Sequence, residues 1–116
     1  MEPKEVLQLW LDAYNNGDAI AVANLYDDHA INHQVAYDPV VGKTAIAERY
    51  ADIFANNHVG CIPVNIFQDG EWAILEWKDP NGLRGSGFFH IRHDKIVLHR
   101  GYWDKVTLER VQHQEQ

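Results

Sequence analysis

The stretch CIPVNIFQDGEWAILEWKDPNGLRGSGFFHIRHDKIVLHRGYW, residues 61–103, decides the fold. Four runs rich in β-forming residues lie within it, at 61–67, 71–77, 83–91 and 95–103. The first break between runs contains Asp69-Gly70, a strong hairpin signal, and the later breaks are also short. Consecutive strands that are joined by tight turns pair antiparallel. The second half of the chain therefore predicts an antiparallel meander.

The first part of the chain has a helical period instead. Apolar residues recur at steps of three and four between Val6 and Tyr14, and Asn16-Gly17 is typical of a helix end. Asp18 can then cap a second, short helix. Its expected apolar face consists of Ile20, Val22, Ala23 and Tyr26.

A third helix is expected after a loop or short strand at 30–35. It should begin near Gly42 and run to about Asn56. The apolar residues that share one face of this helix are Ile46, Tyr50, Ile53 and Phe54.

The expected order of elements is α-α-β-α-β-β-β-β, an α+β domain that spans residues 1–116, with a polar tail from about residue 105. The helices and one sheet face must bury each other. A strongly bent, mostly antiparallel sheet that folds around three helices makes a cone-shaped barrel. Large apolar residues on both faces of the strands predict a homodimer that covers the outer face of the sheet.

The composition excludes wholesale disorder, with 46% hydrophobic and 23% charged residues. A formal net charge of −7 and scattered Lys and Arg argue against nucleic acid and anionic membranes as partners. No apolar run approaches the roughly 20 residues that cross a bilayer, and the first residues lack a secretory layout. A single Cys suits a reducing compartment, so we expect a cytoplasmic location.

Three groups of segments carry a family resemblance. They are YNNGD at 14–18 with LYDDHA at 25–30, VGKTAI at 41–46, and KIV at 95–97 with GYWD at 101–104. In order and spacing they resemble the nuclear transport factor 2-like superfamily, and within it the SnoaL-like and ketosteroid-isomerase-like proteins. The resemblance covers nearly the whole chain and implies a cone with an enclosed pocket. It also implies a small hydrophobic molecule as the partner and no cofactor.

The superfamily includes isomerases, polyketide cyclases, epoxide hydrolases and proteins without catalysis, so fold alone does not fix the reaction. By the resemblance, Trp10 stands where the isomerases keep an oxyanion-binding Tyr, and His33 and Gln34 stand near their Asp base. Gly87 stands near their second Asp, and Gly101 stands where the epoxide hydrolases have a catalytic Asp. The resemblance therefore implies the pocket and leaves the reaction open.

Glu76 is the first candidate for proton transfer because it interrupts the apolar run from Trp72 to Trp77. If its side chain faces the pocket, desolvation would raise its pKa and make it a usable general acid or base. If it faces outward, we expect it to pair with Arg84 or Arg100 and to have a structural role.

His99 and His33 are the other two candidates. His99 shares a strand face with Gly101 and Trp103, which the resemblance directs into the cone, and a histidine there could move a proton near neutral pH. His33 falls beside the base position of the isomerases. The alternatives are a hydrogen-bonded histidine at the sheet rim and a solvated loop histidine.

No metal site is expected. His29 and His33, and likewise His90 and His93, have spacings that can chelate, but no zinc-protease pattern surrounds them. Cys61 has no basic neighbour in the sequence, so we expect it to be a buried packing residue.

Six aromatic side chains are expected to line the pocket: Trp10, Tyr14, Tyr50, Phe54, Phe89 and Trp103. Tyr14 is also a candidate hydrogen-bond donor. The first functional hypothesis is an isomerase, cyclase or hydrolase that uses Glu76, His33 and His99 in general acid–base catalysis on an apolar substrate. The second is a non-catalytic protein of the same fold that binds a small hydrophobic ligand. The third is a dimerisation module with a filled cone.

Overall fold

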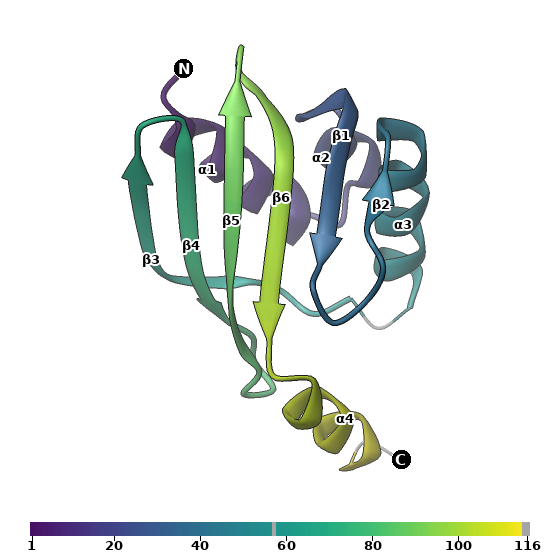
Figure 1. Ribbon diagram of the computed structural model, residues 1–116. Coiled ribbons are helices and arrows are strands. Elements are labelled where there is room, and N and C mark those ends of the chain that lie inside the picture. Colours follow the sequence, from purple (N-terminus) through teal and green to yellow (C-terminus); the bar gives the residue numbers. More distant parts are fainter. Residues whose placement is uncertain (57, 115–116) are drawn as a thin grey trace.

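The computed structural model describes residues 1–56 and 58–114 (Figure 1). The helices are α1 (Pro3–Asn15), α2 (Ala19–Ala23), α3 (Lys43–Ala55) and α4 (Lys105–Gln114). The strands are β1 (Tyr26–Gln34), β2 (Val40–Val41), β3 (Ile62–Asp69), β4 (Trp72–Lys78), β5 (Arg84–Arg92) and β6 (Lys95–Trp103). Figure 1 shows α1 and α2 behind the sheet and α4 extending from the end of β6.

The six strands form one strongly curved sheet in the order β2-β1-β6-β5-β4-β3, and this sheet does not close into a complete barrel. The meander from β3 to β6 is antiparallel throughout, as the sequence predicted. β1 pairs parallel with β6, which makes the sheet mixed. This pairing places Asn32 beside His99 and Gln34 beside Gly101, on strands that are far apart in the sequence.

Local chemistry fixes where the helices begin. A reciprocal capping box between Glu2 and Glu5 opens α1, with Pro3 in its first turn. The Asp18 carboxylate accepts a hydrogen bond from the backbone N–H of Ala21 at 3.0 Å and caps α2. Gly42 precedes α3 with a φ of +91°, a conformation that other residues rarely adopt.

Two details of the predicted second helix are wrong. Ile20 is 73% exposed rather than part of a buried face. Tyr26 lies outside the helix, because α2 ends at Ala23 and Tyr26 is the first residue of β1. β1 is also longer than the strand expected at 30–35, since its pairing with the distant β6 leaves no local signal.

The core lies between the helices and the concave face of the sheet. Its fully buried members include Val6, Leu7, Val22, Ile46, Leu75, Phe89 and Ile96. In the described ranges no helix is both long and apolar enough to cross a membrane.

Candidate functional site

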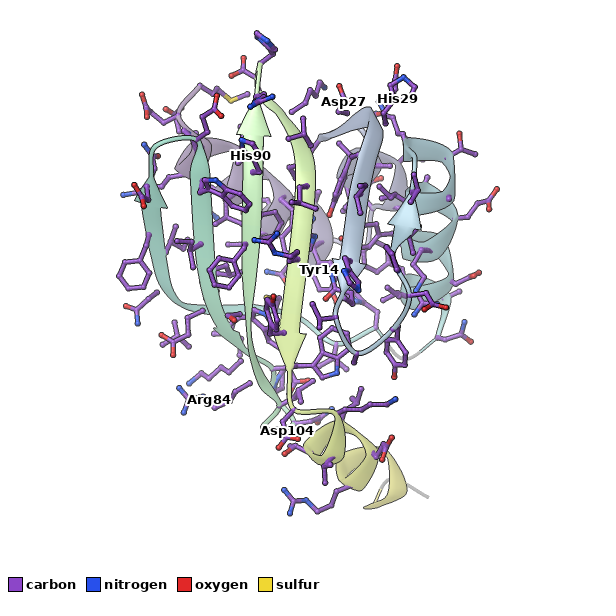
Figure 2. All side chains as sticks on the ribbon, viewed as in Figure 1. Tyr14, Asp27, His29, Arg84, His90 and Asp104 are labelled. Carbon is purple, nitrogen blue, oxygen red and sulfur yellow. The ribbon has the colours of Figure 1, made fainter. Side chains whose placement is uncertain are left out.

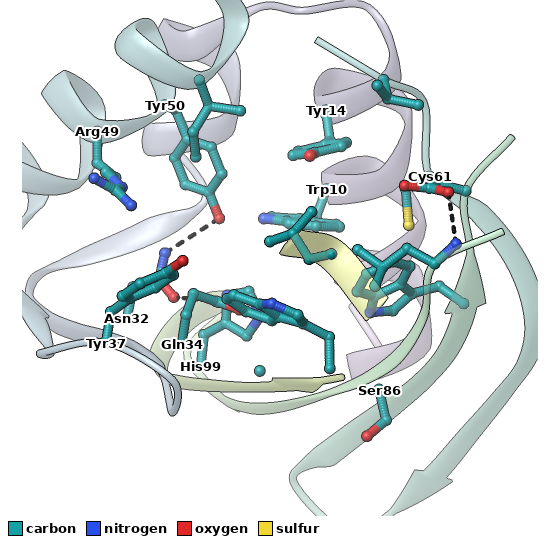
Figure 3. A pocket seen from close by; sticks show the side chains of 18 of the residues that line it. Trp10, Tyr14, Asn32, Gln34, Tyr37, Arg49, Tyr50, Cys61, Ser86 and His99 are labelled. Carbon is teal, nitrogen blue, oxygen red and sulfur yellow. Dashed lines mark hydrogen bonds between the residues drawn. The ribbon is translucent and has the colours of Figure 1, made fainter. Parts of the chain in front are cut away.

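A cavity of about 820 Å³ opens among the helices and the concave face of the sheet (Figure 3). Aromatic and aliphatic walls come from both helices and strands: Trp10, Tyr14, Tyr50, Ile53, Trp77, Leu83, Trp103 and Leu108. Polar uncharged groups also line it, among them Asn32, Gln34, Ser86 and His99. Three charged residues line the cavity. Asp38 and Arg49 are exposed, which places them at its mouth, whereas Asp79 is half-buried and its carboxylate accepts hydrogen bonds from the backbone N–H groups of Asn81 and Leu83.

One side of the aromatic wall is built from rings on α1 and α3. Trp10 and Tyr14 stack on one another with ring centroids 5.0 Å apart. Tyr50 meets Tyr14 edge to face at 6.2 Å, so the rings from the two helices interlock. Figure 3 shows Trp10, Tyr14 and Tyr50 on the helix side of the cavity and Asn32, Gln34 and His99 on the strand side. An apolar wall therefore faces a polar floor.

The Tyr26 hydroxyl is the centre of a buried hydrogen-bond network beneath this cavity. It accepts from Trp10 Nε1 at 3.1 Å. It also bonds to the Tyr50 hydroxyl at 2.7 Å and to His99 Nδ1 at 2.8 Å. Tyr26 is fully buried, so this one hydroxyl joins α1, α3 and β6 without help from solvent.

Two amides from β1 extend the network. Asn32 Nδ2 donates to the Tyr50 hydroxyl at 3.3 Å, and Gln34 Nε2 donates to Asn32 Oδ1 at 2.7 Å (Figure 3). The Gln34 carboxamide occupies the space that a side chain at residue 101 would need. A Cβ built on Gly101 would lie only 1.9 Å from Gln34 Oε1. Gly101 is therefore required for Gln34 to reach its position on the floor.

Burial keeps the network uncharged at neutral pH. It lowers the pKa of His99 to about 3 and raises the pKa of Tyr50 to about 12. Burial, together with the nearby Tyr50, also holds the pKa of Tyr26 well above its usual range. The imidazole is therefore neutral, both phenols are protonated, and the cavity floor offers hydrogen bonds without a charge.

Four of the six aromatic residues expected on the pocket wall line this cavity: Trp10, Tyr14, Tyr50 and Trp103. The other two expectations are wrong in placement. Phe89 lies behind the floor, fully buried and stacked on the His99 ring at 4.0 Å. Phe54 is absent from the lining and packs edge-on against Tyr14 at 5.3 Å.

Of the three proton-transfer candidates, His99 lines the cavity. Glu76 does not, because the alternation of β4 turns Leu75 and Trp77 inward and Glu76 outward. Its carboxylate accepts a 2.7 Å hydrogen bond from Asn65 Nδ2 and lies 4.0 Å from Arg84. This is the outward, structural arrangement that the sequence allowed as the alternative to a side chain facing the pocket. Figure 2 shows Arg84 at the same end of the sheet, directed away from it.

His33 also lies outside the cavity. It is paired in register with Arg100, while its neighbours Asn32 and Gln34 line the cavity floor. The alternation of β1 therefore directs the residue on either side of His33 into the pocket and His33 away from it.

Sequence reasoning missed Tyr26 and Asn32 as members of the site. The alternating positions Ala30, Asn32 and Gln34 were an available signal, since one residue in two of a strand faces the same side. The centre of the network, Tyr26, carried no such signal because its partners Tyr50 and His99 come from other elements.

Cys61 is buried, and this burial raises the pKa of its thiol to about 12, so the thiol stays protonated. Its backbone N–H and carbonyl are both hydrogen-bonded to the Asn15 side chain, at 2.7 and 3.0 Å, which ties the start of β3 to the end of α1. Within residues 1–56 and 58–114, no three His, Cys, Asp or Glu side chains cluster closely enough to hold a metal ion.

Residues 7–99 match the family model described as a SnoaL-like domain, which is well over half of the chain. The chain belongs to the SnoaL-like domain family. No curated protein matches this SnoaL-like domain in sequence.

Solved structures agree with this SnoaL-like domain in fold. A candidate polyketide cyclase from Pseudomonas putida KT2440 superposes with a TM-score of 0.83 at 20% identity, over 93% of this chain and 96% of that chain. An LEH-like epoxide hydrolase from M. tuberculosis gives a TM-score of 0.80 at 19% identity, over 95% and 88% of the two chains. An uncharacterized cystatin-fold protein from Novosphingobium aromaticivorans gives 0.79 at 17% identity, over 88% and 98%. At these identities the likeness establishes the fold and leaves the activity open.

Proposed function

We propose that this SnoaL-like domain binds a small, uncharged, mostly apolar molecule in the cavity between its helices and its sheet. The observation that carries the proposal is a cavity of about 820 Å³ with an aromatic wall and a hydrogen-bonded but uncharged floor. Ligand pockets in proteins have volumes of roughly 300–1,000 Å³ and combine apolar walls with a few placed polar groups. The cavity has both properties.

The charge of the ligand follows from the surroundings of the floor. His99 is 4% exposed and Asn32 is 5% exposed, so a ligand group beside them is removed from water. A carboxylate or an ammonium group buried beside His99 and Asn32 would lose its hydration next to neutral side chains, which costs several kcal/mol. An uncharged oxygen can be satisfied by a neutral N–H or O–H group instead. The exposed charges of Asp38 and Arg49 lie at the mouth, where water screens them.

A second candidate is a cofactor-independent enzyme of the isomerase, cyclase or hydrolase type. The observation in its favour is that the neutral His99 imidazole lines the cavity beside two protonated phenols, Tyr26 and Tyr50. A neutral imidazole can donate a hydrogen bond to a substrate oxygen on which negative charge develops. The binding function ranks first because Glu76 and His33, the other groups expected to move a proton, lie outside the cavity.

A thermal-shift screen tests the proposal. The probes are α-tetralone, its oxygen-free analogue tetralin, and the carboxylate and the primary amine of the same ring system. We expect the ketone to raise the melting temperature and both charged compounds to leave it unchanged. Leu83→Arg, which adds a charged side chain to the wall, is expected to remove the shift, whereas Ile20→Arg on exposed α2 keeps it. A shift from the carboxylate equal to that from the ketone contradicts an uncharged ligand.

We propose in addition that two copies associate through the outer face of the sheet. Large apolar side chains on this side are partly exposed, among them Ile62, Val64, Phe67 and Tyr102. In the strand register Phe67 pairs with Ile74, which pairs with Phe88, so an apolar row crosses three strands of that face. Figure 2 views the sheet from this side, with His90 in front of β5.

The buried, unpaired Cys61 supports a reducing, cytoplasmic location.

A further inference from the structure

The hydrogen-bond chain beneath the cavity has a direction. An indole N–H can only donate, so Trp10 occupies one lone pair of the Tyr26 oxygen. The amide nitrogen of Asn32 also donates only, and it occupies one lone pair of the Tyr50 oxygen. Each phenol is then left with one lone pair and one hydrogen.

Only one arrangement of these hydrogens gives each phenol O–H a partner among the described residues. Tyr26 has two remaining neighbours, Tyr50 and His99 Nδ1, for one hydrogen and one lone pair. If Tyr26 donated to Tyr50, the Tyr50 hydrogen would have no acceptor in the network. If Tyr50 donates to Tyr26, the Tyr26 hydrogen goes to His99 Nδ1 and both phenols are satisfied. Nδ1 is then an acceptor, and the proton of the neutral imidazole lies on Nε2.

The far end of the hydrogen-bond chain is the Asn32 side-chain amide. Gln34 and Gly101 hold this amide in the orientation that the Nε2–H tautomer of His99 requires. Gln34 donates to Asn32 Oδ1, which leaves the Asn32 nitrogen to donate to Tyr50. The Gln34 carbonyl oxygen is the amide atom nearest to the position of a Gly101 side chain. An oxygen there can accept a weak Cα–H contact from Gly101, whereas an NH₂ group would turn its hydrogens against the same Cα–H.

Gly87 leaves the other edge of the imidazole open. A Cβ at Gly87 would lie 3.4 Å from His99 Nε2, so a longer side chain there would cover this nitrogen. Gly87 and Gly101 are direct partners across β5 and β6. These two glycines stand where the resemblance placed aspartates of related enzymes. In this chain Gly87 leaves His99 Nε2 uncovered, and Gly101 leaves room for the Gln34 side-chain amide.

We propose that His99 presents an Nε2–H donor to the cavity and that this donor selects ligands with a carbonyl oxygen, such as ketones, aldehydes, esters and lactones. The ligand class rests on the proposed binding function, whereas the position of the proton does not. Gln34 and Gly101 act as positioning residues because they set the direction of the chain that ends at His99. The low pKa of His99, about 3, and the high pKa of Tyr50, about 12, agree with a hydrogen bond rather than a proton transfer at this donor.

The first test is the tautomer of His99 in the free protein, read from its two ring-nitrogen shifts by ¹⁵N NMR at neutral pH. We expect Nε2 to have the shift of a protonated nitrogen and Nδ1 that of an unprotonated one. A protonated Nδ1 would reverse the chain, make His99 an acceptor and overturn the proposal. This measurement needs no ligand, so its outcome is independent of the proposed function.

The second test concerns the positioning residues. We expect Gly101→Ala, which displaces Gln34, and Gln34→Leu, which removes its amide, each to add a signal from the Nδ1–H tautomer. Gln68→Leu, the same replacement at an exposed position on β3, is the matched control and keeps a single tautomer. A residue with a structural role only would change stability and leave the tautomer alone. An unchanged single tautomer in both variants would refute the positioning roles.

The third test compares α-tetralone with tetralin by calorimetry. We expect the ketone to bind wild-type protein at least about tenfold more tightly, the ratio that 1.4 kcal/mol corresponds to. The ratio should fall to about one in His99→Phe, while His33→Phe on the other face of the sheet keeps it. Equal binding of both probes to wild-type protein overturns the carbonyl selection. Absence of binding by either probe counts against the proposed function and leaves the tautomer result standing.

Discussion

Replacing Tyr26 with Phe tests whether the buried hydroxyl network holds the fold together. The change removes one oxygen from a fully buried ring and leaves the ring itself in place. Trp10 Nε1, His99 Nδ1 and the Tyr50 O–H then lose their partner, whereas Tyr50 still accepts the hydrogen bond from Asn32. An orphaned buried polar group costs about 1–3 kcal/mol, so three of them predict a loss of at least about 3 kcal/mol in the free energy of unfolding.

The assay is urea unfolding at one fixed protein concentration, followed by circular dichroism. Tyr37→Phe is the matched control, because Tyr37 is 44% exposed and its hydroxyl has no hydrogen bond to another described residue. We expect the control to differ from wild type by less than about 0.5 kcal/mol. If Tyr26→Phe loses no more than the control, with an unchanged m-value, the network does not stabilise the fold and the reasoning is refuted.

Three further predictions follow from the site and the outer face. The unfolded chain protonates His99 below its ordinary pKa of 6.5 but the folded chain only near 3, so the free energy of unfolding should fall by about 2 kcal/mol between pH 7.5 and 5. His99→Gln should remove that part of the slope, and an unchanged slope contradicts a buried neutral imidazole. Glu76→Gln should change the free energy of unfolding by less than about 0.5 kcal/mol and leave ligand binding intact, because the Glu76 side chain is 45% exposed on the outer face. A loss of ligand binding in this variant would show that Glu76 belongs to the binding site. Light scattering should give twice the 13.4 kDa chain mass for wild type and a monomer for Phe67→Asp, and a monomeric wild type would exclude the proposed dimer.

The elements that the sequence predicted well are those whose signals are local. β6 begins and ends where the sequence placed it, at Lys95 and Trp103. The turn before it is made by His93 and Asp94, which both have positive φ. The Asp18 cap and the Asp69-Gly70 hairpin were recognisable for the same reason, since the residues that fix the backbone lie beside one another.

The parts of the site that sequence missed depend on contacts between distant segments. Tyr26 was assigned to a helix face, but its hydrogen bond to His99 spans 73 residues. Its place in β1 follows from the parallel pairing with β6, which no local pattern reports.

The choice of His33 and Glu76 failed for a different reason, the period of two in a strand. Moving by one residue along a strand changes the face that a side chain occupies. His33 lies next to Asn32, which lines the cavity, and Glu76 lies next to Trp77, which also lines it. The sequence identified the right strands, and the register of the sheet shows which of their faces is inside.

The most direct measurement of the central claim is a ¹H–¹⁵N NMR titration of the four tryptophan indole groups with α-tetralone. Trp10, Trp77 and Trp103 line the cavity. Trp72 does not; it stacks on His90 at 4.7 Å on the outer face and serves as an internal control. We expect the indole signals of Trp10 and Trp103 to shift with ligand concentration while that of Trp72 stays in place. A shift of Trp72 alone, or no shift at a ligand concentration that saturates the thermal response, would contradict a ligand in the cavity.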